Sequence, residues 1–123
     1  MALVPASRPC VPADRYRAGV PAYVLAEIDV RDPDAYEPYK ALASASITAF
    51  GGTYRVRGGP VEAFEGEAPT GRIVVLEFPD VEAARAWYHS DGYQAAAAIR
   101  QSASQGRMFL IDGVVPSSVT GAS

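Results

Sequence analysis

The chain has 123 residues, with 11 basic and 14 acidic side chains, a net charge of −3 and a pI near 5.0. This acidic balance argues against a general nucleic-acid-binding protein, which is usually basic. The length suits one domain that folds without metal or disulfide support, and the single cysteine, Cys10, excludes an intrachain disulfide and a multi-cysteine metal site.

The two ends of the chain differ from its centre. Residues 1–20 are rich in proline and predict a flexible N-terminal arm, whereas residues 116–123 predict a polar C-terminal tail. Residues 21–115 are therefore expected to form the compact domain. The sequence contains no apolar run long enough for a membrane-spanning helix and no signal-peptide pattern, so we expect a cytoplasmic protein without membrane contact.

Helix and strand patterns alternate along the domain. Asp32-Pro33 predicts a helix start, Pro38 indicates a later start or a bend, and Gly51-Gly52 predicts the end of that helix. A second helix is expected after Asp80, with an interruption at Ser90-Asp91-Gly92. The strands are expected over residues 22–29, 53–57, 72–78 and 107–111, with a short candidate strand over 61–64.

Three of these strands are apolar on both faces, which is typical of a sheet that is buried on both sides. They are Tyr23–Ile28, Ile73–Phe78 and Met108–Ile111. Only about two helices are available, enough to cover one face. The element order predicts an α+β, ferredoxin-like split βαβ fold, with an antiparallel sheet and two helices on one face. A second copy is expected to cover the other face, which gives a homodimeric α+β barrel.

The chain resembles the domain of unknown function 1330 family of the dimeric α+β barrel superfamily over roughly residues 22–113. The matching segments are Tyr23–Ile28, Asp32-Pro33, Tyr36, Tyr39, Gly51–Gly59, Arg72–Phe78, Ala86–Ser90, Tyr93 and Arg100. The resemblance implies the fold and dimerisation but no defined activity. Phe50 stands where the family often has His, and Asp91-Gly92 where it often has Pro. Neighbouring families include cofactor-independent monooxygenases, haem proteins and small isomerases.

Two residues are candidate proton-transfer groups. His89, the only histidine, is either a general acid or base in a pocket or a surface residue near a helix end. Glu27, like Glu77, interrupts an apolar strand and needs a partner such as Arg72 or Arg100. Each carboxylate is either a proton acceptor with a raised pKa or part of an ion pair that fixes dimer register.

Arg55 and Arg57 are candidate anion-binding residues. They lie two positions apart on one predicted strand, so we expect them to share a face, with Tyr54 and Val56 on the other. Their planar guanidinium groups suit a carboxylate or phosphate. The alternative is an ion pair, for instance with Glu62 or Glu65 across the Gly58-Gly59 turn.

The aromatic content points to a pocket for a small molecule, although ordinary core packing would use the same residues. Two hypotheses remain open: a homodimeric binding protein for a small hydrophobic or aromatic molecule, acidic or neutral, and a cofactor-independent enzyme of the monooxygenase, isomerase or cyclase type. Neither hypothesis requires a metal or cofactor. The candidate ligand-binding residues are Tyr39, Tyr54, Arg57, Arg72, Trp87, Tyr88 and Tyr93, and the candidate catalytic residues are His89 and Glu27.

Overall fold

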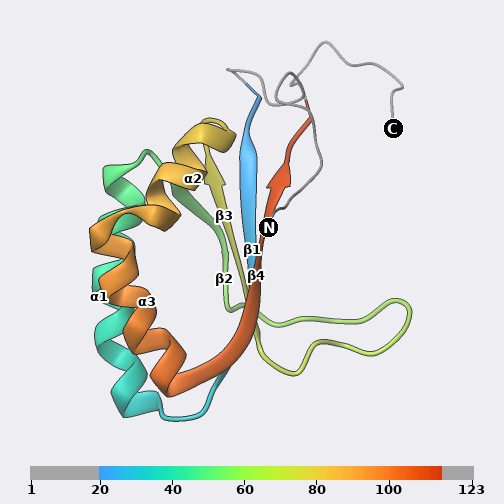
Figure 1. Ribbon diagram of the computed structural model, residues 1–123. Helices are drawn as coiled ribbons and strands as arrows, with labels where there is room; N and C mark the ends of the chain where they lie inside the picture. Colours follow the sequence, from blue (N-terminus) through green and yellow to red (C-terminus); the bar gives the residue numbers. More distant parts are fainter. Residues whose placement is uncertain (1–19, 115–123) are drawn as a thin grey trace, which may run out of the picture.

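The computed structural model describes residues 20–114 (Figure 1). The predicted N-terminal arm, apart from the buried Val20, and the predicted C-terminal tail lie outside these residues. The elements follow the order β1 (Ala22–Val30), α1 (Pro33–Ala49), β2 (Thr53–Arg57), β3 (Arg72–Phe78), α2 (Val81–His89), α3 (Asp91–Ala103) and β4 (Ser104–Asp112).

The strands form one antiparallel sheet in the order β2-β3-β1-β4, and all three helices lie on one side of it (Figure 1). This arrangement confirms the predicted ferredoxin-like α+β fold. The final strand is longer than expected, because it pairs with the whole length of β1.

The helix ends follow the polar caps in the sequence. The Asp32 carboxylate accepts a hydrogen bond from the backbone N–H of Ala35 at 3.1 Å, and α1 continues through Pro38 without a break. Pro38 lies near the start of the helix and removes only one backbone donor there, while Tyr36 and Tyr39 beside it are buried.

Ser90 separates the second helical region into α2 and α3. Its hydroxyl donates to the Trp87 carbonyl at 2.7 Å and accepts from the Tyr93 N–H at 3.1 Å, so one side chain ends α2 and begins α3. Asp80 caps α2 by accepting from the Ala83 N–H at 2.8 Å.

The short strand expected over residues 61–64 is absent: residues 58–71 form a loop, which we call the β2–β3 loop. Figure 1 shows this loop extending away from the helices, past the opposite side of the sheet. Glycine and proline interrupt the segment, and its residues take part in none of the strand pairings of the sheet.

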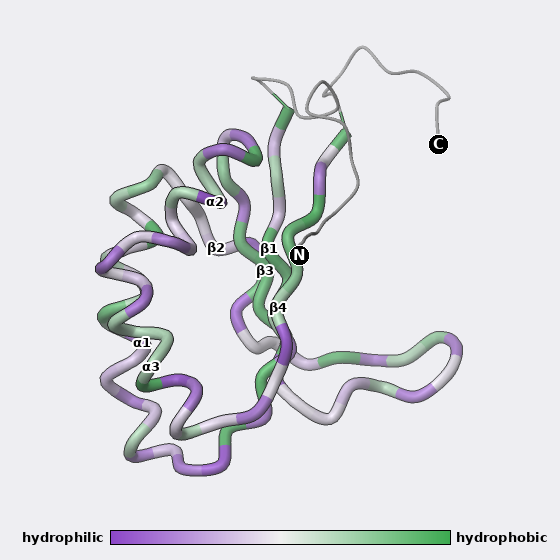
Figure 2. The backbone as a smooth tube through the Cα atoms, viewed as in Figure 1, coloured by the Kyte–Doolittle hydropathy of each residue, from purple (hydrophilic) through white to green (hydrophobic). Residues whose placement is uncertain are grey.

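Successive side chains of each strand point to opposite sides, so the sheet has two different faces. One face packs on the helices and supplies much of the core, including Val24, Leu76 and Phe78. The other, which we call the open face, carries no covering element, although its strands are largely hydrophobic (Figure 2). The open face comprises Tyr23, Leu25, Val56, Ile73, Val75, Phe109 and Ile111.

A β-bulge in β2 overturns the predicted orientation of its arginines. The register shifts between Tyr54 and Val56, so Tyr54 and Arg57 both point toward the helices. Arg55 lies on the open-face side, where it pairs with Glu77. The extra residue breaks the two-residue alternation on which the expectation relied.

Gly52, in the turn after α1, packs closely against core side chains and offers a test of this packing. A Cβ atom at Gly52 would lie 2.7 Å from both Ile47 Cγ2 and Phe78 Cε1. Because both neighbours are buried, we expect Gly52→Ala to lower the free energy of unfolding by about 1–3 kcal/mol. Urea denaturation at fixed chain concentration measures the change.

Gly59→Ala is the matched control, because a Cβ atom there would meet nothing within 4 Å. It should change the free energy of unfolding by no more than about 0.5 kcal/mol. Equal effects of the two substitutions would contradict the packing described for Gly52.

Candidate functional site

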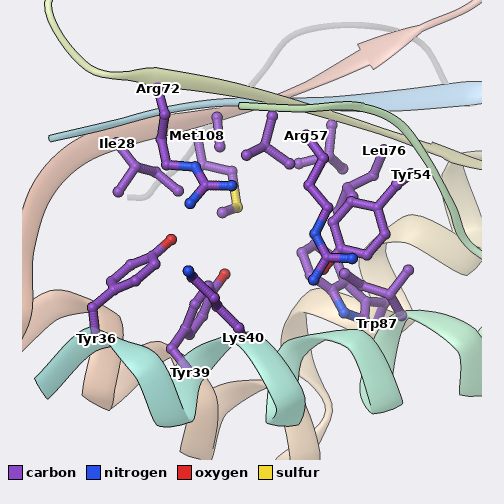
Figure 3. A pocket seen from close by; sticks show the side chains of 14 residues that line it. Ile28, Tyr36, Tyr39, Lys40, Tyr54, Arg57, Arg72, Leu76, Trp87 and Met108 are labelled. Carbon is purple, nitrogen blue, oxygen red and sulfur yellow. The ribbon is translucent and has the colours of Figure 1, made fainter. Parts of the chain in front are cut away.

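A cavity lies between the helix-facing side of the sheet and α1 (Figure 3). Apolar side chains from β1, β3, β4 and α1 form most of its wall, and several polar side chains point into it. The lining residues are Val24, Ala26, Ile28, Tyr36, Tyr39, Lys40, Ile47, Tyr54, Arg57, Arg72, Val74, Leu76, Trp87 and Met108.

Arg72 is the most unusual polar residue of the cavity. Its Nε is the single buried side-chain nitrogen or oxygen, among the described residues, that has no hydrogen-bond partner. The guanidinium lies against Gly58, where an added Cβ would be 2.8 Å from one terminal nitrogen. Gly58 also has φ of 75°, so the turn after β2 both requires glycine and holds Arg72 toward the cavity (Figure 3).

Tyrosine hydroxyl groups form the α1 side of the cavity. Burial raises the pKa of Tyr36, although Arg72 and Arg100 act in the opposite direction. Burial also raises the pKa of Tyr39 well above its usual range, and the adjacent Tyr93 hydroxyl adds to this effect. Both phenols therefore remain protonated, and a protonated phenol can donate a hydrogen bond to an acceptor.

Tyr93 supports this wall from behind. It is fully buried, its hydroxyl lies 2.9 Å from that of Tyr39, and Arg100 Nε donates to it at 3.3 Å. Tyr93, a predicted ligand-binding residue, is not itself part of the cavity lining and contacts the lining residue Tyr39.

Two further cationic side chains, Arg57 and Lys40, line the cavity together with Arg72. Arg57 lies 4.1 Å above the Tyr54 ring and donates to the Ser44 hydroxyl at 3.2 Å, and Lys40 Nζ lies 3.4 Å from Glu37. Figure 3 shows these side chains directed toward the same space as Arg72. No carboxylate belongs to the lining, so the cavity combines three cationic side chains with an apolar wall.

Trp87 forms part of the cavity wall at the end far from Arg72 (Figure 3). The indole is 1% exposed, its ring centroid lies 4.2 Å from that of Tyr93, and its Nε1 donates to Ser46 Oγ at 3.0 Å. Trp87 also lines a second hollow, together with Val24 and Met108, so these three side chains are common to both spaces.

The second hollow, which we call the edge cleft, lies between α2 and β4 and has a volume of about 290 Å³. Two predicted site residues, Tyr88 and His89, lie here and not in the cavity. His89 is exposed at the last position of α2, with its ring 5.2 Å from that of Tyr88. The edge cleft is lined by Val24, Ala84, Arg85, Trp87, Tyr88, His89, Met108, Phe109 and Leu110.

The strand carboxylates have different partners from those expected. Glu27 accepts from Arg107 Nε at 3.0 Å, and Glu77 accepts from Arg55 Nε at 2.8 Å. Both pairs lie on the open-face side of the sheet, so Glu27 is separated from the cavity by the sheet itself. The expected partners were wrong, because cross-strand register brings Arg107 directly opposite Glu27.

The structure thus gathers five of the predicted residues, Tyr39, Tyr54, Arg57, Arg72 and Trp87, around one cavity. Sequence reasoning did not assign Tyr36, Lys40 or Met108 to a site. Tyr36 and Lys40 are four residues apart and therefore share a helix face, a signal that could have indicated both. Within residues 20–114, no cluster of three or more His, Cys, Asp or Glu side chains is placed to hold a metal.

The protonated state of Tyr39 leads to a testable pH dependence. Its folded-state pKa lies above the value of about 10 expected for an unfolded chain, so the unfolded chain loses the proton first. The contribution of the protonated Tyr39 to the free energy of unfolding is fully present below about pH 10. Above that pH it declines, by up to about 1.4 kcal/mol per pH unit. We expect the free energy of unfolding of Tyr39→Phe to fall less steeply with pH above pH 10 than that of the unmodified chain. Urea denaturation at several pH values measures both slopes.

The slope with pH is the readout, because Tyr39→Phe also removes a hydrogen bond with Tyr93 and lowers stability at every pH. Tyr23→Phe, on the open face, controls for the loss of a phenol. A Tyr39→Phe slope equal to that of the unmodified chain would contradict the prediction.

Solved structures similar to this chain share its fold. A protein of unknown function from Rhodopseudomonas palustris is 20% identical, with a TM-score of 0.65 over 84% of this chain and 88% of that one. A dimeric ferredoxin-like protein of unknown function from Jannaschia sp. CCS1 is 20% identical, with a TM-score of 0.58 over 77% and 99%. SnoaB, a cofactor-independent oxygenase from Streptomyces nogalater, is 16% identical, with a TM-score of 0.50 over 80% and 99%.

At these identities the likeness establishes the fold alone. None of the curated proteins matches the chain. Within the described residues, no helix has the length and apolar character needed to cross a membrane. The family described as a domain of unknown function, DUF1330, matches residues 21–114, and the chain belongs to this family.

Proposed function

We propose that this protein is a homodimer that binds a small molecule with an apolar or aromatic body and an acidic group in the cavity between α1 and the sheet. The observation that carries the proposal is the buried Arg72 Nε, which has no partner and belongs to a cavity with no carboxylate in its lining. A buried donor without a partner is costly, and an anionic ligand would remove that cost.

The remaining polar groups suit the same anion. Arg57 and Lys40 add positive charge, and the protonated Tyr36 and Tyr39 hydroxyls can donate to an acceptor oxygen. The apolar wall from Ile28 to Trp87 would contact the body of the ligand. A carboxylate attached to a ring or short chain combines these two properties.

The cavity is small without a ligand. Its enclosed space is about 30 Å³, which holds about one or two water molecules. A larger occupant would displace the side chains at the mouth, where Arg57 is exposed and Lys40 is partly exposed. Met108 in the wall is unbranched and adapts its shape readily.

The positions of the proton-transfer candidates favour binding over catalysis. His89 lines the edge cleft, and Glu27 lies across the sheet in a pair with Arg107. Neither group reaches a ligand in the cavity, as a general base must. The enzyme alternative rests on a fold shared with a cofactor-independent oxygenase, and a shared fold does not carry chemistry with it.

The open face supports the homodimer. Its apolar residues come from all four strands, and Leu25, Val75 and Val56 occupy neighbouring positions at its centre. A contiguous apolar surface of this kind is unusual in a monomer, and a second copy offers a matching surface about a two-fold axis. The paired residues Glu27–Arg107 and Arg55–Glu77 would form a polar border.

Benzoate and its neutral analogue benzyl alcohol test the binding proposal. We expect benzoate to bind at least about tenfold more tightly, which corresponds to about 1.4 kcal/mol, because only benzoate can pair with Arg72. Arg72→Gln should abolish this difference. The fluorescence of Trp87, the only tryptophan, reports directly on the cavity wall, and calorimetry gives the affinity.

Arg31→Gln is the matched control, because Arg31 is exposed and bonded to Asp29 and Gln105 away from the cavity. It should leave the preference for benzoate intact. Equal affinities for the two compounds, or an unchanged preference in Arg72→Gln, would refute the anion site.

A charge at the centre of the open face tests the homodimer. The unmodified chain should sediment at twice its 13.0 kDa mass, and Val75→Arg should sediment as a folded monomer because it places two arginines in the interface. Leu42→Arg, on an exposed position of α1, should remain dimeric. A monomeric unmodified chain at micromolar concentration would reject the homodimer.

A further inference from the structure

The β2–β3 loop presents a large hydrophobic side chain to solvent. Phe64 is 92% exposed, the highest value among the exposed large hydrophobic residues described, and every residue from Gly58 to Ala68 is exposed. Leaving a phenylalanine ring in water forgoes the gain from burying it. No other part of the described chain covers this ring.

The direction and length of the loop show what it can reach. It extends past the side of the sheet opposite the helices (Figure 1). About half of residues 58–71 lead outward, which allows a reach of roughly 20 Å at about 3.3 Å per residue. Two sheets packed face to face lie only about 10 Å apart, so the loop would extend beyond the partner's sheet.

We propose that the β2–β3 loop embraces the second copy and places Phe64 in the edge cleft of that copy, between α2 and β4. The inference rests on the proposed homodimer and not on the anion site. The two-fold axis makes the exchange reciprocal, so each dimer would bury two Phe64 rings.

The edge cleft is the hollow whose chemistry matches the tip of the loop. Its volume is about 290 Å³, and Trp87, Tyr88 and Leu110 give it an apolar lining. The cavity beside Arg72 encloses only about 30 Å³. The two other hollows described are lined mainly by charged and polar residues, which would not favour a phenyl ring.

Charge also matches between the two surfaces. Three carboxylates flank Phe64 on the loop, and none forms an ion pair with another described residue. The edge cleft includes the cationic side chain of Arg85 in its lining. Opposite charges around an apolar contact favour one orientation of the partners. The loop carboxylates are Glu62, Glu65 and Glu67.

Cross-linking between two differently tagged, co-expressed chains tests the proposal. Cys10, the only native cysteine, is replaced by serine in every chain. One chain carries Phe64→Cys and the other Leu110→Cys, and a short bismaleimide should join them covalently. Pairing Phe64→Cys with Leu42→Cys, on the exposed side of α1, should give no product.

A second measurement uses the strength of the dimer. Phe64→Ser should raise the dimer dissociation constant at least about tenfold in sedimentation experiments, because two buried rings are lost, whereas Leu42→Ser should not change it. A dimer with no 64–110 product, or with Phe64→Ser dimerising like the unmodified chain, would overturn the loop exchange alone. A monomeric unmodified chain would overturn the exchange and the homodimer together, and benzoate binding reports separately on the cavity.

Discussion

All layers of the domain meet at the indole of Trp87. The ring comes from α2, packs on Tyr93 of α3 and Phe78 of β3, and donates its only hydrogen bond to Ser46 of α1. A buried indole N–H requires such a partner, so the bond fixes both the depth and the orientation of the ring. Because Trp87 lines both the cavity and the edge cleft, its position shapes the walls of both.

Much of this fold could be predicted from local signals. Asp32, Asp80 and Ser90 each cap a helix through the N–H three residues ahead, an interaction that depends only on nearby residues. The two-faced apolar strands likewise indicated a sheet with more hydrophobic surface than its helices cover. The open face, with Leu25 and Val75 opposite each other at its centre, is the structural counterpart of that pattern.

The candidate site was less predictable, because it depends on contacts between distant residues. The bulge in β2 turns Arg57 toward Tyr54. No residue type in that strand indicates that it contains the extra residue of a bulge. Glu27 finds Arg107 through the register of β1 with β4, so its partner lies eighty positions away. Arg72 stood out in the sequence as a partner for a carboxylate, yet in the structure its Nε has none.

The cavity and the open face share one strand, so the proposed ligand site and the proposed dimer interface use opposite faces of the same element. Side chains of β3 alternate, so Arg72 lines the cavity while Ile73 and Val75 face the other way. The β2–β3 loop also begins at Gly58, directly against the Arg72 guanidinium, and its first N–H bonds to the Ile73 carbonyl at 2.8 Å. In the proposed dimer, a loop held by the second copy would also have its root at Gly58 held, beside Arg72. The proposed anion site and the proposed loop exchange would then be linked through Gly58, which contacts the Arg72 guanidinium and begins the loop.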